Sequence, residues 1–302
     1  MTKRQIEIVE VSARDGLQNE KQIFSTEQKI ELITRMVASG ARRLEVASFA
    51  RPDRVPQMAD AEAVIAGLSL PDDVVTIGLV MNKKGALRAL ETKVKELGAV
   101  CVATDAFAGR NQGQTSRESA EMAADVVRFA RSEGRRAQVT IGASFGCPLE
   151  GEVSADHVVE LARRIAEADP VEIALADTIG VAVPQQVFAL VSRVREAIGS
   201  IPVRVHLHNT RGTGIANAWA AIEAGAATLD SSVGGIGGCP FAPNATGNIA
   251  TEDLLYMLDR SGVATGYDLS PTIETAKWLS TVMRAQLPAL VSRAGPFPTP
   301  KA

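Results

Sequence analysis

The feature that most constrains the fold is a regular alternation of strand-like and helix-like segments along nearly the whole sequence. The strand-like segments are short and mostly apolar, as in Val74–Val80, and segments with helical periodicity alternate with them, as in Pro184–Ile198. We count eight such units with no linker between them. Repeated units of this kind predict a parallel sheet, and eight predict a closed (β/α)8 barrel of the α/β class. A doubly wound open sheet ranks lower, because no Gly-x-Gly-x-x-Gly motif follows the first strand.

Capping motifs and glycines predict where the helices begin and end. Capping boxes at Ser25-x-x-Gln28 and Thr115-x-x-Glu118 each predict the start of a helix. Between them we expect a helix at Lys84–Leu97, which Gly98 ends. Residues 264–302 follow the last unit and predict a helical extension and a tail, so that the whole chain, 1–302, is expected to form one catalytic barrel domain.

Composition limits the partners and the compartment. A net charge of -3 gives no sign of a nucleic-acid partner. The 3 cysteines, an odd number without close spacing, argue against a disulfide framework and for a reducing compartment, which we expect to be the cytoplasm. The first residues carry no signal-peptide pattern, and no apolar run is long enough to span a bilayer, so no membrane partner is expected.

The end of the first strand carries an unusual pair of charges. An apolar alternation ends abruptly in Arg14-Asp15-Gly16, which predicts a strand that runs into a tight turn, with Gly16 supplying a permissive backbone. A guanidinium and a carboxylate at this place are costly to bury unless they are paired or in use. A salt-bridged turn is the simpler interpretation of such a pair. A functional role is favoured because other reactive side chains also follow predicted strands, namely Glu45, His206, His208, Cys239 and Asn248.

Two histidines of the seventh strand predict a metal site. His206 and His208 are two residues apart, so both point to one face of the strand, and a metal explains such a stacked pair better than a structural role does. Asp15 and an amide such as Asn248 would add oxygen ligands. A mixed nitrogen and oxygen set suits Mg²⁺ or Mn²⁺ better than tetrahedral zinc.

A glycine-rich loop follows the eighth strand and ends on a cysteine. Four glycines stand at 234–238, directly before Cys239. A phosphate cradle is one interpretation, since barrels often bind phosphate after this strand. A mobile lid is preferred, because a thiol on a closing loop can transfer a proton only when the site is shut.

Two further carboxylates end predicted strands. Asp177 ends the sixth strand, where it could hold a metal-bound histidine by its second nitrogen. Glu45 ends the second strand and points inward, so that it could orient Arg14 or activate a metal-bound group. A purely structural role is an equal alternative for both.

Six motifs along the sequence belong together: Arg14–Glu20, Val55–Met58, Gly146–Pro148, Asp177–Val181, Gly237–Pro240 and Ala245–Leu254. Together they resemble the hydroxymethylglutaryl-CoA lyases, a branch of the metal-dependent barrel enzymes that also include isopropylmalate synthase. The resemblance covers about residues 5 to 290 and keeps the order of the motifs. The Leu17–Glu20 continuation and the Cys239 loop point to the lyase branch.

The resemblance implies an activity: metal-assisted retro-Claisen cleavage of 3-hydroxy-3-methylglutaryl-CoA to acetyl-CoA and acetoacetate, a reaction of leucine degradation. It also implies a divalent cation held by Asp15, His206, His208 and Asn248. By similarity, Arg14 stabilises the enolate, Cys239 or a metal-activated water protonates it, and Glu45 is the acidic residue of the reaction. Ser48 and Asn111, together with Thr140 and Asp177, are expected near an acyl-CoA substrate. A homo-oligomer, as a dimer, is expected.

The sequence departs from the family pattern at the fifth strand. Thr140 stands where many members carry tyrosine, and Gln138 stands where they carry arginine. These differences do not affect the proposed metal ligands. They concern the part of the site that would contact the C3 substituent of the substrate, so the identity of that substituent stays open. A related 3-hydroxy-3-substituted acyl-CoA, including citramalyl-CoA, is therefore an alternative substrate. A condensing synthase on a 2-oxo acid and a non-catalytic binding protein are further alternatives; a synthase would be expected to carry a long regulatory extension.

Overall fold

The computed structural model describes residues 4–238 and 247–298 and contains a closed barrel of eight parallel strands. The strands follow one another around the barrel in chain order, and β1 closes it by pairing with both β2 and β8. This confirms the predicted (β/α)8 architecture. The strands are β1 (Glu7–Glu10), β2 (Arg43–Ser48), β3 (Val75–Val80), β4 (Glu96–Val102), β5 (Arg136–Gly142), β6 (Ile173–Asp177), β7 (Val203–Leu207) and β8 (Thr228–Ser231).

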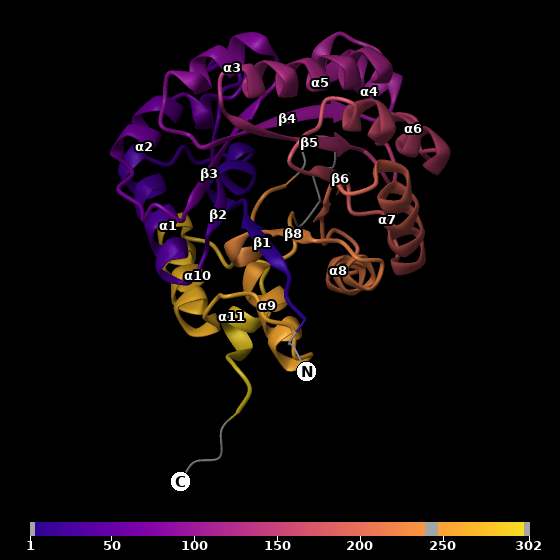
Figure 1. The fold of residues 1–302 in the computed structure, drawn as a ribbon. Helices are drawn as coiled ribbons and strands as arrows, with labels where there is room; N and C mark the ends of the chain where they lie inside the picture. The colour runs from indigo at the N-terminus through magenta and orange to yellow at the C-terminus, as the bar shows by residue number, and fades with distance from the viewer. Residues whose placement is uncertain (1–3, 239–246, 299–302) are drawn as a thin grey trace.

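Helices surround the strands and cover their outer faces (Figure 1). They bury apolar side chains between helix and strand, in one continuous core that reaches around the barrel. The helices that follow successive strands are α1 (Thr26–Ala38), α2 (Ala61–Gly67), α3 (Lys83–Leu90), α4 (Asp105–Gln112), α5 (Ser116–Ser132), α6 (Ala155–Ala166), α7 (Pro184–Ile198), α8 (Gly214–Glu223) and α9 (Thr251–Arg260).

Both predicted capping boxes are present. The Ser25 hydroxyl accepts from the backbone N–H of Gln28, whose side chain accepts from the N–H of Ser25. Thr115 and Glu118 make the same reciprocal pair at the start of α5. These pairs satisfy backbone donors that a helix start would leave without partners.

The predicted helix at Lys84–Leu97 is wrong at its C-terminal end. The helix, α3, ends at Leu90, and β4 already begins at Glu96. Gly98 lies within this strand, where a Cβ atom would stand 2.9 Å from Nε2 of Gln138. The glycine therefore permits close packing inside the barrel instead of ending a helix. Helix α4 was not expected from the sequence at all.

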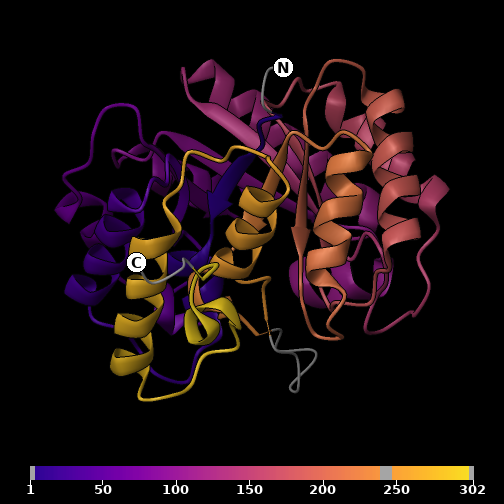
Figure 2. The same ribbon diagram turned by 90° about the horizontal axis from the view of Figure 1, so that it is seen from below.

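The C-terminal segment adds two helices to the barrel. Helix α10 (Leu269–Met283) packs against α1 and α9, and the short α11 (Val291–Ala294) contacts α9 and α10. Figures 1 and 2 both place α10 beside α1, the first helix of the barrel.

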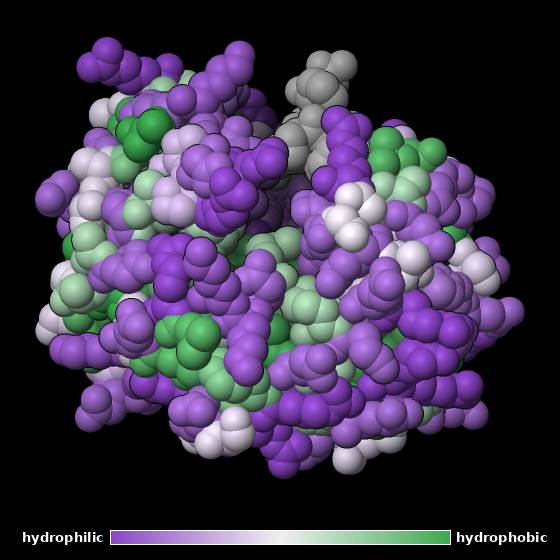
Figure 3. All heavy atoms as spheres, turned by 90° about the horizontal axis from the view of Figure 1, so that it is seen from above, coloured by the Kyte–Doolittle hydropathy of each residue, from purple (hydrophilic) through white to green (hydrophobic). Residues whose placement is uncertain are grey.

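The surface beside α3 and α5, which are uppermost in Figure 1, is mostly hydrophilic. Figure 3 views it from above and places hydrophobic residues there in small separate groups. Among the described residues, no helix is both long and apolar enough to cross a membrane.

Candidate active site

A single wide helical turn at Ser12–Gly16 follows β1 and carries Arg14 and Asp15. The sequence predicted that Gly16 supplies an unusual backbone conformation, and this is wrong, because Gly16 is not among the glycines with positive φ. The reason for glycine is space. A Cβ atom at this position would lie 2.8 Å from the side chain of Ile236 and 3.0 Å from the hydroxyl of Ser232. Gly16 thus lets the turn pack directly on the segment that follows β8.

The guanidinium of Arg14 is held by two carboxylates. Its Nε donates to Oε2 of Glu45 at 2.6 Å, and its Nη2 donates to the same oxygen. Its Nη1 donates to Oδ1 of Asp15 at 2.6 Å. Glu45 therefore orients Arg14, one of the two roles that the sequence left open for it.

Asp15, His206 and His208 converge with their ligand atoms facing one another. The Nε2 atoms of the two histidines lie 3.1 Å apart, and Oδ2 of Asp15 lies 3.9 Å from each. The three ligand atoms all lie within 4.8 Å of one another. Asn248 joins them by donating from Nδ2 to Oδ2 of Asp15 at 2.8 Å. The structure thus brings together the four residues that the sequence proposed as metal ligands.

The protonation of these groups fits a cation. Burial and the neighbouring His206 lower the pKa of His208 to about 4, so its ring is neutral at pH 7. Burial alone would raise the pKa of Asp15, but Arg14 and the two histidines hold it below its usual range. Oδ1 of Asn248 is buried and has no hydrogen-bond partner among the described residues. A carboxylate, two imidazoles and a free amide oxygen are a suitable donor set for a divalent cation.

A carboxylate that the sequence did not single out orients His206. Oδ2 of Asp230, on β8, lies 3.0 Å from Nδ1 of His206 and leaves Nε2 facing Asp15. Asp177 does not take this role; its contacts fit the purely structural role that the sequence left as an equal alternative. Its two oxygens accept from the backbone N–H groups of Val181 and Ala182, so it shapes the loop after β6. A partner such as Asp230 fixes the tautomer and the direction of a metal-binding imidazole.

One cavity lies at the C-terminal ends of the strands, where barrel enzymes hold their active sites. It is lined by Arg14, Asp15, Glu45, His206, His208 and Asp230. Asn111 and Thr140 line it as well. Ser48, which was also expected near the substrate, is not among the lining residues, and its hydroxyl accepts from the N–H of Ala50 instead. Three apolar side chains also line the cavity, namely those of Val100, Val102 and Phe107.

The glycine-rich loop is anchored at its base by buried carboxyl groups. Glu10 accepts from the N–H of Val233, and Glu252 accepts from the N–H of Gly234. Farther along the loop, Nδ2 of Asn19 donates to the carbonyl of Gly238 at 2.8 Å. Cys239, the predicted proton carrier, lies outside the described residues.

Known proteins resemble this chain over nearly its whole length. The HMGL-like family model matches residues 5–279. An (R)-citramalyl-CoA lyase of Chloroflexus aurantiacus is 42% identical over 304 residues, which cover 96% of this chain and 95% of the relative. A 3-hydroxy-3-isohexenylglutaryl-CoA/hydroxymethylglutaryl-CoA lyase of Pseudomonas aeruginosa is 37% identical over 280 residues, with 93% of each chain covered.

A solved structure agrees with the fold. An HMG-CoA lyase from Acinetobacter baumannii, in complex with coenzyme A and 3-methylmalate, superposes with a TM-score of 0.92 at 37% identity, and the match covers 98% of both chains.

Proposed function

The chain belongs to the HMGL-like family, and from that membership we propose that it is a carbon–carbon lyase that cleaves a 3-hydroxy-3-substituted acyl-CoA thioester. The observation that carries the proposal is the convergence of Asp15, His206 and His208 in the cavity that also holds Arg14. A cation site next to a fixed guanidinium would suit a substrate that carries an alcohol and a carboxylate at one end and a thioester at the other.

The metal is proposed to be Mg²⁺ or Mn²⁺, held by Asp15, His206, His208 and Asn248. When bound, a divalent cation supplies the Lewis acidity that makes the tertiary hydroxyl of the substrate acidic. Asp230 keeps His206 in the tautomer that presents Nε2 to the cation. The free Oδ1 of Asn248 and the neutral ring of His208 complete the donor set.

The proposed reaction is a retro-Claisen cleavage. The hydroxyl loses its proton, the bond between C2 and C3 breaks, and the electron pair of that bond passes to the thioester as an enolate. Arg14 stabilises the charge that grows on the thioester oxygen, and Glu45 keeps the guanidinium in place. A proton from Cys239 or from water then converts the enolate to acetyl-CoA, while C3 leaves as the carbon of a ketone.

Two substrates are candidates, and they differ by one methylene group. 3-Hydroxy-3-methylglutaryl-CoA would give acetoacetate, and it is favoured by the match of the core motifs to the hydroxymethylglutaryl-CoA lyases. Citramalyl-CoA would give pyruvate, and it is favoured by the 42% identity to an (R)-citramalyl-CoA lyase. Thr140 on the cavity wall is the residue from which we expect a difference in selectivity.

A coupled assay tests the proposal. Purified protein with Mg²⁺ or Mn²⁺ is mixed with each thioester, and acetyl-CoA is measured together with acetoacetate or pyruvate. We expect one acetyl-CoA for each ketone formed. Release of free CoA only when a 2-oxo acid and acetyl-CoA are supplied would indicate a condensing synthase instead. We further propose that the protein acts in the cytoplasm and that it is a homodimer. Sedimentation of the purified protein tests the dimer, and fractionation of the cells tests the compartment.

A further inference from the structure

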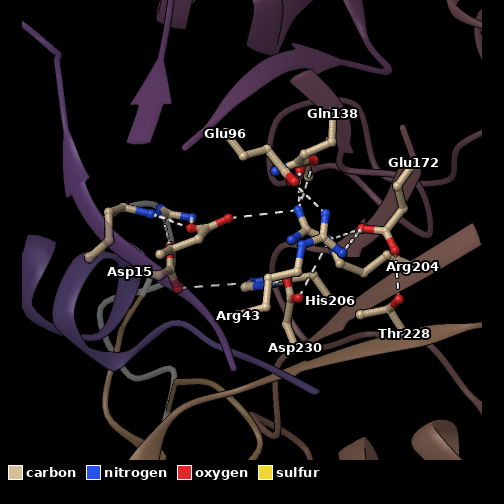
Figure 4. Close-up of polar contacts among 12 residues, drawn as sticks. Asp15, Arg43, Glu96, Gln138, Glu172, Arg204, His206, Thr228 and Asp230 are labelled. Carbon is tan, nitrogen blue, oxygen red and sulfur yellow. Dashed lines mark hydrogen bonds and ion pairs between the residues drawn. The ribbon is translucent and has the colours of Figure 1, made fainter. Parts of the chain in front are cut away.

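Arg204 lies beneath the candidate site and takes no part in the reaction proposed above. It stands on β7, two residues before His206, and therefore points to the same face of the strand. Its side chain is 0% exposed. Figure 4 shows its guanidinium among Gln138, Glu172 and Asp230, all directed into the barrel.

The guanidinium contacts several strands at once. Its Nη2 donates to Oε1 of Gln138 at 2.9 Å and to Oγ1 of Thr140 at 3.2 Å. The same Nη2 lies 3.7 Å from Oε1 of Glu45. Its Nε lies 3.5 Å from Oδ1 of Asp230 and 3.5 Å from Oε2 of Glu172; both are ion pairs, since this Nε makes no hydrogen bond to a described residue.

In both Glu45 and Asp230, one carboxylate oxygen contacts a residue of the candidate site and the other faces Arg204. Oε2 of Glu45 accepts from Arg14, and its Oε1 faces Arg204. Oδ2 of Asp230 contacts His206, and its Oδ1 faces Arg204 while making no hydrogen bond to another described residue. Arg204 is thus a common neighbour of the carboxylate that holds Arg14 and the carboxylate that holds His206.

We propose that Arg204 is a positioning residue that fixes Glu45 and Asp230 from below and thereby orients both Arg14 and His206. Two buried carboxylates that lie 3.7 Å and 3.5 Å from one guanidinium are stabilised by its charge, and the planar group can face them with separate nitrogens. Lysine would bring the same charge as a single point and could not hold both carboxylates in one geometry. Gln138 and Thr140 hold the guanidinium itself in place.

A second buried arginine offers a matched control. Arg43, on β2, belongs to the same layer of ion pairs inside the barrel and contacts Glu7, Glu96 and Glu172. Its ion pairs do not include Glu45 or Asp230. If Arg204 only balances buried charge, Arg43→Lys and Arg204→Lys should have similar effects.

The test compares these two variants in two measurements. The first is the Kd for Mn²⁺, measured by calorimetry without substrate. We expect Arg204→Lys to weaken binding by about tenfold, which is at the lower end of the effects of outer-shell partners. The second is steady-state cleavage of the thioesters, in which we expect kcat to fall about 10- to 100-fold with little change in KM, because the transition state depends on Arg14. Arg43→Lys should keep both constants within about twofold, since outer-shell losses are confined to partners of the ligands.

Milder variants cover the case in which Arg204→Lys does not fold. Gln138→Leu and Thr140→Val each remove one contact of the guanidinium while the buried charge remains. Both should weaken Mn²⁺ binding and lower kcat in the same direction, by less than Arg204→Lys does. Wild-type constants in all the folded variants, or an equal loss in Arg43→Lys, would overturn the proposal.

The inference rests on the proposed function only for the turnover measurement. A wild-type protein that binds Mn²⁺ but cleaves no thioester would contradict the proposed function, and the Mn²⁺ comparison would still decide the role of Arg204. A wild-type protein that does neither would overturn both.

Discussion

The Nε2 atoms of His206 and His208 lie 3.1 Å apart, and Oδ2 of Asp15 lies 3.9 Å from both. Without a cation, these two nitrogens can attract each other only through one shared proton, and the lowered pKa of His208, about 4, keeps its ring neutral at pH 7. A divalent cation among the three atoms would stabilise this arrangement. From the positions of these three side chains we expect the activity of the protein to depend on a divalent metal.

Arg14→Lys should lower kcat far more than it raises KM. The guanidinium is fixed by Glu45 and Asp15, and a lysine ammonium cannot make both contacts in the same geometry. Loss of one such preorganised donor typically costs on the order of 10²–10³ in turnover. Steady-state kinetics on the preferred thioester measures the effect. A change confined to KM would contradict the assignment of Arg14 to the transition state.

Alkylation of the native protein with a thiol reagent should modify Cys239 and abolish activity. The other two thiols, Cys101 and Cys147, are buried, and burial raises the pKa of Cys101 to about 12, so little thiolate is available there. Peptide mapping by mass spectrometry identifies the modified residue, and substrate should protect it. Cys239→Ser should keep the affinity for Mn²⁺ and lose most turnover. Inactivation that tracks modification of Cys101 or Cys147 would refute the role of Cys239.

The stability of the protein should fall as the pH rises from about 5 to about 8. Burial raises the pKa of Glu252 from 4.5 to about 8. The folded state therefore holds a proton that the unfolded state has lost in this range, and its stabilising contribution disappears as the pH passes the folded pKa. At roughly 1.4 kcal/mol per pKa unit, the contribution is on the order of a few kcal/mol.

Glu252→Gln isolates this contribution, because the amide stays neutral at every pH. Urea unfolding at pH 5, 7 and 8.5 should show that the variant loses less stability than the wild type as the pH rises. Glu91→Gln, at an exposed position at the end of α3, serves as the control and should follow the wild-type curve. Parallel curves for Glu252→Gln and the wild type would show that Glu252 is already ionised in the folded protein.

Thr140→Tyr should narrow the enzyme toward the methylglutaryl substrate. Thr140 lines the cavity, and tyrosine would add a ring and a phenolic hydroxyl near the reacting carbon. A polar contact of this kind discriminates more strongly than a change of one methylene, which is typically worth about 10- to 200-fold. The measurement is the ratio of kcat/KM for the two thioesters.

Thr140→Val is the control for this substitution. It keeps the volume of threonine but removes the hydroxyl that accepts from Arg204. The specificity ratio should therefore change with tyrosine and stay near the wild-type value with valine. An unchanged ratio in Thr140→Tyr would refute the pocket argument and leave the lyase assignment intact.

Much of the fold follows from local signals in the sequence. The capping boxes at Ser25 and Thr115 predicted the helix starts, because these contacts lie within four residues of one another. Gly98 led to a wrong prediction of where the helix ends, because the glycine is needed for close packing against Gln138 on the neighbouring strand. Packing between strands is not encoded in a local pattern, and so the boundary between α3 and β4 could not be placed.

The site residues could be predicted where the residue type suited a metal or an active site and the position in or after a strand placed the side chain inside the barrel. This was so for the proposed metal ligands, which lie at or beyond the ends of strands and are of types that bind cations: Asp15, His206, His208 and Asn248. Arg204 lies on the same face of β7 as His206 and could have been placed inside the barrel by the same argument. Its partners, however, stand on three other strands, β2, β5 and β8, and at Glu172 just before β6. Asp230 was missed in favour of Asp177 because both are acidic residues of buried strands, and only the folded barrel reveals which of them reaches His206.

Release of acetyl-CoA by metal-depleted and metal-restored protein tests the central claim most directly. The protein is treated with a chelator until elemental analysis detects no divalent metal, and it is then supplied with 3-hydroxy-3-methylglutaryl-CoA or citramalyl-CoA. We predict no acetyl-CoA from the depleted protein, and equal amounts of acetyl-CoA and ketone product after Mg²⁺ or Mn²⁺ is added. Full release without metal, or no release from either thioester with metal, would contradict the account.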